Sequence, residues 1–318
     1  MSFLYYFSPA VMLNFVAKIN IMKTVYSFLI CIYCFLSVNA QDHSKLNALP
    51  NSTVTTYFSG GHEARARQMA TRVENALAFY QQLIGFRPSV TILLLSKADW
   101  NSYTNFPVYG MPHYKGDSTL IVAAEDNEFW KSNLPVKDLP ADIRKQAEKI
   151  YSLPDGSFSM QAFFDLLAIH ELGHAFHNQG KLKVQRKWMG ELFCNILLHT
   201  YIAEKEPGQL PALTLFPKIV INGGTKNYEY TSLQELEENY NEIAQRYPQN
   251  YGWYQCRWHA AAATIYNADG ITAFKKLWTA LQSEQNKLDD AEFSKLLETK
   301  VSRSVADVWL RWERDTVK

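Results

Sequence analysis

The sequence feature that most constrains this chain is the stretch His170-Glu-Leu-Gly-His174, which follows a run of mainly apolar residues. That run holds no Pro or Gly, so the pattern predicts a helix. Residues four apart lie on one face of a helix, and the two imidazoles would therefore point the same way. Unpaired polar groups are costly to bury, so an apolar helix rarely places two His and a Glu together unless something binds them.

Two imidazoles at this spacing can hold one zinc ion, and Glu171, one position further round the helix, can reach a water molecule on the open side of the metal. This is the H-E-x-x-H arrangement of zinc hydrolases. Chance places it in a chain of this length in about one case in a hundred or fewer. We therefore expect one Zn²⁺ per chain, with His170 and His174 as two of its ligands.

A catalytic zinc site needs a third protein ligand and one open position. Glu191 is the best candidate, because it stands in a second apolar helix, expected over 188–203, where an unpaired carboxylate would be expensive. Three ligands in a row on one straight helix cannot surround an ion, which disfavours His177. The alternatives that the residues leave open are Glu204, Glu206, His177, His199 and Cys194.

Composition allows a sizeable core and argues against a nucleic-acid partner. The 318 residues are 47% hydrophobic and 14% aromatic, enough for one large domain or two small ones. Lys and Arg total 32 against 31 Asp and Glu, and no basic cluster stands out.

The N-terminus indicates export. Lys23 precedes an apolar centre of signal-peptide length, and Val38-Asn-Ala40 resembles a small-residue cleavage site. We expect residues 1–40 to be a signal peptide, with Met22 as a possible true start, and the mature chain to be secreted or periplasmic without a stable membrane span. A signal anchor is the alternative if residues before Lys23 extend the apolar segment. Of the cysteines, Cys194 and Cys256 would remain, and we expect both to be buried and separate.

The pattern of the mature chain, residues 41–318, predicts an α+β fold with a small N-terminal mixed sheet-and-helix part at about 52–130 and a mainly helical part at about 140–318. We expect strands at 54–58, 89–95 and 118–124, the last as a sheet edge that could accept an extended peptide. His113 is interpreted as an ordinary loop histidine, and the section after Pro207 as irregular. The expected helices are 63–83, one near 141–150, a helical region from Ser232 onward, 251–266, 271–281 and 305–312.

His170-Glu-Leu-Gly-His174 followed by Trp188-x-x-Glu191 resembles the gluzincin metallopeptidases, in particular the peptidase-MA-like group, where a Trp-x-x-Glu-Gly-x-Ala-x-Tyr helix brings the third zinc ligand. Leu192 stands where that pattern has Gly, and Cys194 where it has Ala. The resemblance spans roughly residues 54–315 and is strong only at the two motifs. It implies a zincin-like fold and favours Glu191 over its alternatives.

The resemblance also implies roles for individual residues. Glu171 would act as the general base toward a zinc-activated water. A donor from the later helical region would stabilise the oxyanion, with Tyr254 as the first candidate. Asn195 resembles the position where many gluzincins carry an acid that holds a zinc histidine, and the amide could weaken that support. The other candidates for the oxyanion donor are Tyr251, Tyr230 and His259.

These features predict an exported zinc-dependent peptidase that acts on a peptide or protein substrate. One alternative is a binding or scaffold protein of zincin fold with weak or no activity. Another is a zinc amidohydrolase that acts on a non-peptide amide. Tyr109-Gly-Met-Pro-His113 matches only the first half of the Gly-x-Met-x-Asn strand of aminopeptidases, so we do not infer an aminopeptidase.

Overall fold

The computed structural model describes residues 43–116 and 118–316, of which Leu46 onward belongs to one compact unit. The expected signal peptide, residues 1–40, lies outside the described residues. Within the described ranges, no helix combines the length and the apolar composition that crossing a membrane requires.

A five-stranded mixed sheet begins the unit, in the order β1-β2-β3-β5-β4. The three central strands are parallel, and the two edge strands, β1 and β4, pair antiparallel with their neighbours. β3 and β5 are apolar and almost fully buried, as expected of strands covered on both faces. The strands are β1 (Asn47–Ala48), β2 (Thr55–Phe58), β3 (Thr91–Leu95), β4 (His113–Lys115) and β5 (Thr119–Ala123).

The prediction of the sheet edge was wrong. The strand expected at 118–124 is β5, which lies inside the sheet between β3 and β4. The edge is β4, and it begins at His113, which was interpreted as a loop residue. A three-residue strand has too little alternation to show a period, and β4 exists because its backbone pairs with β5.

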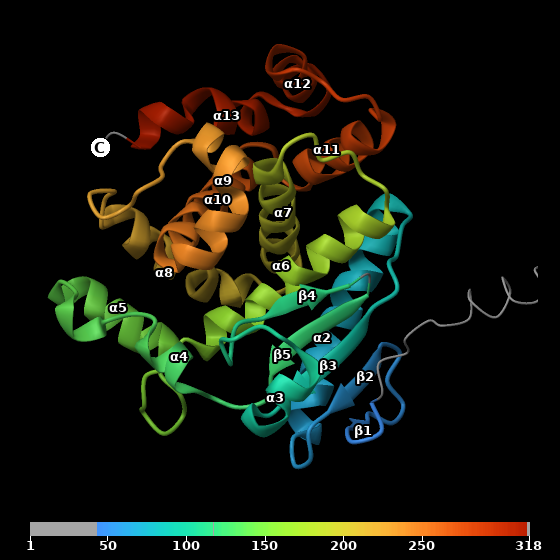
Figure 1. Cartoon of the computed structure of the whole chain (residues 1–318), viewed down its shortest axis with the longest axis vertical. Helices are drawn as coiled ribbons and strands as arrows, with labels where there is room; N and C mark the ends of the chain where they lie inside the picture. The colour runs from blue at the N-terminus through green and yellow to red at the C-terminus, as the bar shows by residue number, and fades with distance from the viewer. Residues whose placement is uncertain (1–42, 117, 317–318) are drawn as a thin grey trace, which may run out of the picture. The chain divides into compact units, whose positions relative to one another are not determined.

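Helices make up most of the remainder (Figure 1). α2 packs on β2, α6 packs on β4 and β5, and α2 and α6 contact each other, so the two form a helical layer over the sheet. The helices are α2 (Glu63–Ile84), α3 (Lys97–Tyr103), α4 (Glu128–Ser132), α5 (Ala141–Tyr151), α6 (Gln161–Gln179), α7 (Lys187–Lys205), α8 (Leu210–Asn222), α9 (Leu233–Arg246), α10 (Pro248–Asp269), α11 (Ile271–Ser283), α12 (Asp290–Leu296) and α13 (Arg303–Thr316), with short helical turns η1 (Val136–Asp138), η2 (Pro207–Gln209) and η3 (Leu297–Val301).

Local sequence signals set several helix ends. α2 ends at Gly85, which adopts the left-handed conformation (φ 70°) that glycine tolerates best. α9 begins with a capping box, in which the Ser232 side chain and Glu235 bond to each other's backbone N–H groups. An equivalent box of Asp289 and Glu292 begins α12.

α8 corrects a second prediction, because the section after Pro207 is helical rather than irregular. Pro211 stands in the first turn, where a backbone N–H has no helical partner to lose. Pro217 lies inside the helix and is buried. Apolar packing of α8 against α10 and α5 outweighs the local cost of that proline.

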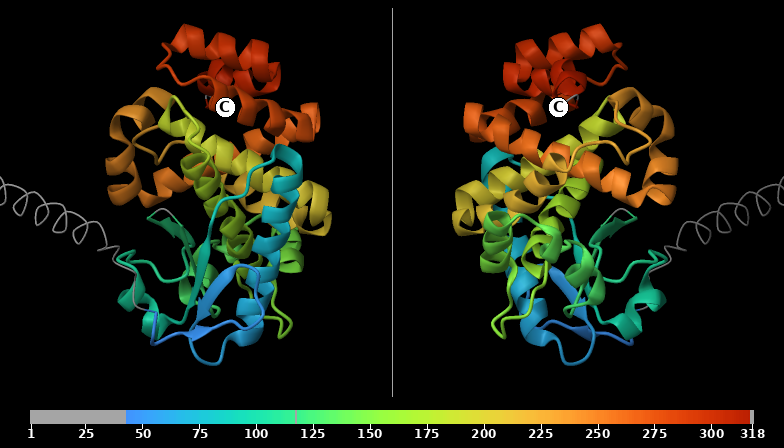
Figure 2. Two further views of the ribbon diagram at one scale, coloured as in Figure 1. Left: turned by 90° about the vertical axis from the view of Figure 1, so that its right-hand side faces the viewer. Right: turned by 90° about the vertical axis from the view of Figure 1, so that its left-hand side faces the viewer.

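α7 is the central helix of the unit. It packs against α6 on one side and α10 on another, and its residues Trp188 to Ile202 are all buried. Figure 2 shows the strands gathered at one end of this unit and α11 to α13 at the other. The fold is therefore α+β, with a small mixed sheet followed by a mainly helical part, as the sequence predicted at this level.

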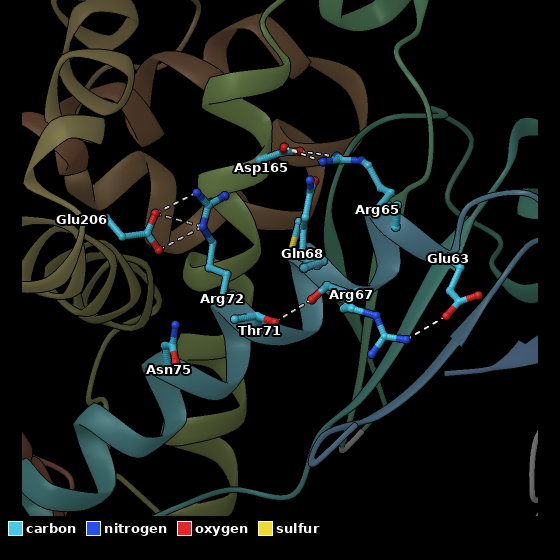
Figure 3. Close-up of a pocket in the computed structure, with 11 residues that line it drawn as sticks. Glu63, Arg65, Arg67, Gln68, Thr71, Arg72, Asn75, Asp165 and Glu206 are labelled. Carbon is cyan, nitrogen blue, oxygen red and sulfur yellow. Dashed lines mark hydrogen bonds and ion pairs between the residues drawn. The ribbon is translucent and has the colours of Figure 1, made fainter. Parts of the chain in front are cut away.

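Two ion pairs tie α2 to the helices around α7. The Arg65 guanidinium binds both oxygens of Asp165 at the start of α6, and Arg72 binds both oxygens of Glu206 just after α7. Both pairs line a groove of about 890 Å³, and Figure 3 shows Gln68 between them. Because the arginines are already paired with carboxylates, we interpret this groove as part of the packing of α2.

Candidate metal centre

The centre starts from α6, where His170 and His174 lie next to each other as their spacing predicts. Their ring centroids are 5.3 Å apart and the rings are nearly perpendicular. α6 is enclosed by the sheet and α7, so His170 is buried and the His174 side chain is 23% exposed. The His174 ring is thus the more accessible of the two.

Cys194 on α7 completes a group of ligand atoms that could hold a metal ion. One ligand atom from each of His170, His174 and Cys194 lies within 4.8 Å of the other two. The Cys194 Sγ is 3.5 Å from His174 Nδ1. Burial raises the pKa of this thiol, and the nearby carboxylates of Glu171 and Glu191 add to that shift. The structure thus brings one of the alternative ligands named above into the centre.

Close packing of the two helices produces this approach. A Cβ atom on Gly173 would lie 2.9 Å from both the Cα and the Sγ of Cys194. α6 and α7 can therefore come this close only because residue 173 has no side chain. Cys194 is separate from Cys256, and both are free and buried, as predicted.

Glu191, the predicted third ligand, meets the centre at His170. Its Oε2 is 3.3 Å from His170 Nε2, and both side chains are buried. Burial by itself would raise the pKa of Glu191, but the hydrogen bond with His170, the nearby His174 and the Tyr240 hydroxyl together lower it. Glu191 is therefore a carboxylate at neutral pH.

Two donors from later helices hold the Glu191 carboxylate. The Tyr240 hydroxyl donates to Oε1 at 2.6 Å, and Gln255 Nε2 donates to Oε2 at 2.7 Å. The Tyr251 hydroxyl joins both of these side chains, at 3.1 Å from the Tyr240 hydroxyl and 2.9 Å from Gln255 Nε2. The carboxylate thus has a complete set of partners although it lies in an apolar helix.

Sequence reasoning missed Tyr240 and Gln255 as parts of the centre. Both stand in helices that the sequence predicted, the region from Ser232 onward and 251–266, but neither side chain was a candidate. One signal was available in the sequence. Tyr251 and Gln255 are four residues apart, so their polar groups would lie on the same face of one helix. That they meet Glu191 depends on how α9 and α10 pack on α7.

Glu171 faces the edge of the sheet. Its carboxylate interacts with the backbone of Tyr114 in β4, and its Oε2 is 3.9 Å from His174 Nε2. Burial raises the pKa of Glu171 to about 7, opposed by the His170 charge and reinforced by that of Glu191. A carboxyl group with this pKa can both accept and release a proton near neutral pH.

His170 and His174 have different neighbours behind their rings. His170 Nδ1 and Asn195 Oδ1 are both buried and have no hydrogen-bond partner among the described residues. Burial by itself would lower the pKa of His170, but the carboxylates of Glu191 and Glu171 raise it, and the Asn195 amide adds a smaller contribution. Asn195 is held in turn, because its Nδ2 donates to the Glu191 carbonyl oxygen and to Gln255 Oε1. His174 instead has His177 behind it, with His177 Nε2 at 3.0 Å from His174 Nδ1.

Tyr254, the predicted oxyanion donor, has its contacts elsewhere. Its hydroxyl donates to the Ser232 carbonyl oxygen at 2.7 Å, and its ring stacks on Trp312 and Trp258. Among the described residues, no hydrogen bond or ring contact joins it to His170 or His174. Its catalytic role stays a prediction from the resemblance.

The other candidates from the sequence are spread over the molecule. Glu204 accepts a hydrogen bond from Tyr266, and Glu206 is paired with Arg72. The ring of His199 also packs against Tyr266. His259 is buried, with its ring centroid 6.4 Å from that of His170. Tyr230 packs on Tyr247.

Comparison with known protein families gives no match to this chain, and comparison with curated proteins gives none either.

Proposed function

We propose that this chain is a zinc-dependent peptidase of the gluzincin type, with a zincin-like fold. The observation that carries the proposal is the placement of Glu171. It lies between His174, one of the two histidines of the metal-binding group, and the backbone of the edge strand β4. A base between a metal centre and an open strand edge is placed to act on the backbone of an extended peptide.

The ligands would be His170, His174 and Glu191, with zinc bound one per chain. Support for Glu191 comes from its ionised state, its 3.3 Å approach to His170, and the two donors that fix its carboxylate. Cys194 is the alternative, because its Sγ and one ring nitrogen of each of the two histidines lie within 4.8 Å of one another. Imidazole, carboxylate and thiolate are all ligands that zinc accepts.

Bound zinc supplies Lewis acidity, which makes water a nucleophile at neutral pH. Glu171 takes the proton as the water oxygen bonds to the substrate carbonyl carbon. When the C–N bond breaks, the same carboxyl group gives that proton to the leaving amine. Backbone groups on the free side of β4 would hold the substrate as an added strand.

Export by the segment at residues 1–40 belongs to the same proposal, as does a peptide or protein substrate. The two alternatives predict different behaviour of the purified chain. A scaffold of the same fold would bind zinc without turnover. An amidohydrolase would leave peptides intact and cleave other amides.

Metal content and cleavage of a peptide library test the proposal together. The wild-type chain should hold about one zinc ion and cleave peptides. Glu171→Gln should keep the metal and lose about 10²- to 10⁴-fold in turnover, because only the proton acceptor is gone. Glu204→Gln is the matched control, a glutamate of α7 bonded to Tyr266, and it should change neither quantity.

Two further variants in the same assay decide the third ligand. Glu191→Ala should lose most of the zinc, whereas Cys194→Ala should keep it. The opposite pattern would assign Cys194 as the ligand. Full zinc occupancy without cleavage of any peptide would favour the scaffold or amidohydrolase alternative, and absence of zinc from the wild type would overturn the proposal.

A further inference from the structure

His177, one turn after His174 on α6, contacts that ligand histidine directly. Its Nε2 is 3.0 Å from His174 Nδ1, and the two ring centroids are 5.2 Å apart with the planes at 75°. The Phe193 ring packs edge-on against His177 from α7, with centroids 6.2 Å apart. The position of the His177 ring is thus set by both helices.

The two nitrogens of His174 have different surroundings. Nε2 faces the carboxylate of Glu171 at 3.9 Å, on the side where substrate would react. Nδ1 faces the opposite side, toward His177 Nε2 at 3.0 Å and Cys194 Sγ at 3.5 Å. A neutral imidazole that binds a metal through one nitrogen carries its proton on the other.

If Nε2 binds the metal, the Nδ1 proton of His174 needs an acceptor. The His177 nitrogen is at ordinary hydrogen-bond distance, whereas the Cys194 sulfur is a weak acceptor and further away. His177 therefore acts from behind the ligand ring. His177 contacts the Nδ1 side of the His174 ring, whereas Glu171 lies on the Nε2 side.

We infer that His177 is the positioning residue of His174. It accepts the Nδ1 proton and holds the ring with Nε2 toward the metal. This inference rests on the proposed function, because it needs a metal bound at His174. The two histidines then differ in the residue that lies behind the ring, which is Asn195 for His170 and His177 for His174.

Zinc affinity measured by competition with a chelator tests the inference without any activity assay. His177→Ala should bind zinc about 10- to 100-fold more weakly than the wild type. His177→Gln should recover most of the affinity, because its carbonyl oxygen can accept the same proton. His62→Ala is the control, a histidine beside Glu125 at the start of α2, and it should bind like the wild type.

Nitrogen-15 NMR of the histidines in the zinc-loaded wild-type chain gives a second readout. We expect a proton on His174 Nδ1 and none on His177 Nε2. A proton on His177 Nε2 would overturn the inference, and this measurement decides the question even if the alanine variant does not fold. Failure of the wild type to bind zinc would overturn the proposed function instead. Zinc binding with equal affinity in wild type and His177→Ala would overturn only the role of His177.

Discussion

At the scale of single residues, the free-energy cost of burying the Glu191 carboxylate has to be offset by the partners that bind it. Desolvation of an ion costs several kcal/mol, which is more than one ordinary hydrogen bond returns. The chain meets this cost with three contacts to Glu191, from His170, Tyr240 and Gln255. The backbone of α9 leaves helical geometry at Asn239 (φ −114°, ψ 21°), the residue just before Tyr240.

Tyr240→Phe should weaken zinc binding about 10-fold, at the lower end of what the loss of one partner behind a ligand costs. The hydroxyl that donates to Glu191 Oε1 is removed, while Gln255 still holds Oε2. Chelator competition measures the change. An affinity equal to that of the wild type would mean that the hydroxyl does not order the carboxylate for the metal.

Tyr254→Phe is the matched control for this substitution. Its hydroxyl donates to the Ser232 carbonyl oxygen, so its removal should leave zinc affinity unchanged. A loss of peptide cleavage at unchanged affinity would instead support the catalytic role that the resemblance implies for Tyr254.

At the scale of elements, the contact between α6 and α7 decides which side chains of the two helices meet in the centre. Gly173 of the H-E-x-x-H stretch faces Cys194 across the two helices, with no room for a methyl group. Close packing with α7 therefore explains the glycine at this position. Its neighbours His170 and His174 reach the groups of α7 because the helix axes are this close.

Gly173→Ala should destabilise the fold by about 1–3 kcal/mol, the usual cost of forcing an extra methyl group into a packed core. Helix propensity alone would give the opposite sign, since alanine stabilises a helix interior by about 1 kcal/mol relative to glycine. Urea unfolding measures the free energy.

Gly190→Ala is the control for that substitution. Gly190 lies in α7, and a Cβ atom added there would have a Val184 methyl group as its nearest neighbour, at an ordinary contact distance of 3.8 Å. The free energy of unfolding should therefore be unchanged or higher. Destabilisation of both variants by the same amount would contradict the role of close packing at Gly173.

At the scale of the whole unit, the centre joins residues that are far apart in the chain. Glu191 of α7, which contacts His170 of α6, is bonded to Tyr240 of α9 and to Gln255 of α10. The complete set of contacts therefore exists only in the folded unit, and a metal bound there stabilises that unit against unfolding.

Removal of the metal should lower the unfolding temperature of the whole unit in one transition. Zinc at about 100 times its dissociation constant raises the free energy of unfolding by about 2.7 kcal/mol, which corresponds to an increase of about 5 °C in the unfolding temperature for a domain of this size. Calorimetry of the wild-type chain with and without a chelator measures the shift. His170→Ala should show no shift, and an equal shift in both chains would mean that the chelator acts elsewhere.

The sequence predicted the strong periodic elements well and the weakly patterned ones poorly. The α+β class and the helices that carry His170, His174 and Glu191 follow from long apolar runs, and α6 and α7 lie where they were expected. β4 and α8 were missed for opposite reasons. β4 is too short to show a period, and the prolines of α8 hide a helix that packing sustains.

By itself, the sequence determined that His170, Glu171 and His174 share a helix and that a buried carboxylate follows on the next one, because helical spacing and the cost of burial are local properties. Only the tertiary structure decided which groups surround them. Cys194, Tyr240 and Gln255 reach the centre, and β4 reaches Glu171, through contacts between elements distant in the chain. Such contacts depend on helix packing and strand order, which local patterns do not encode.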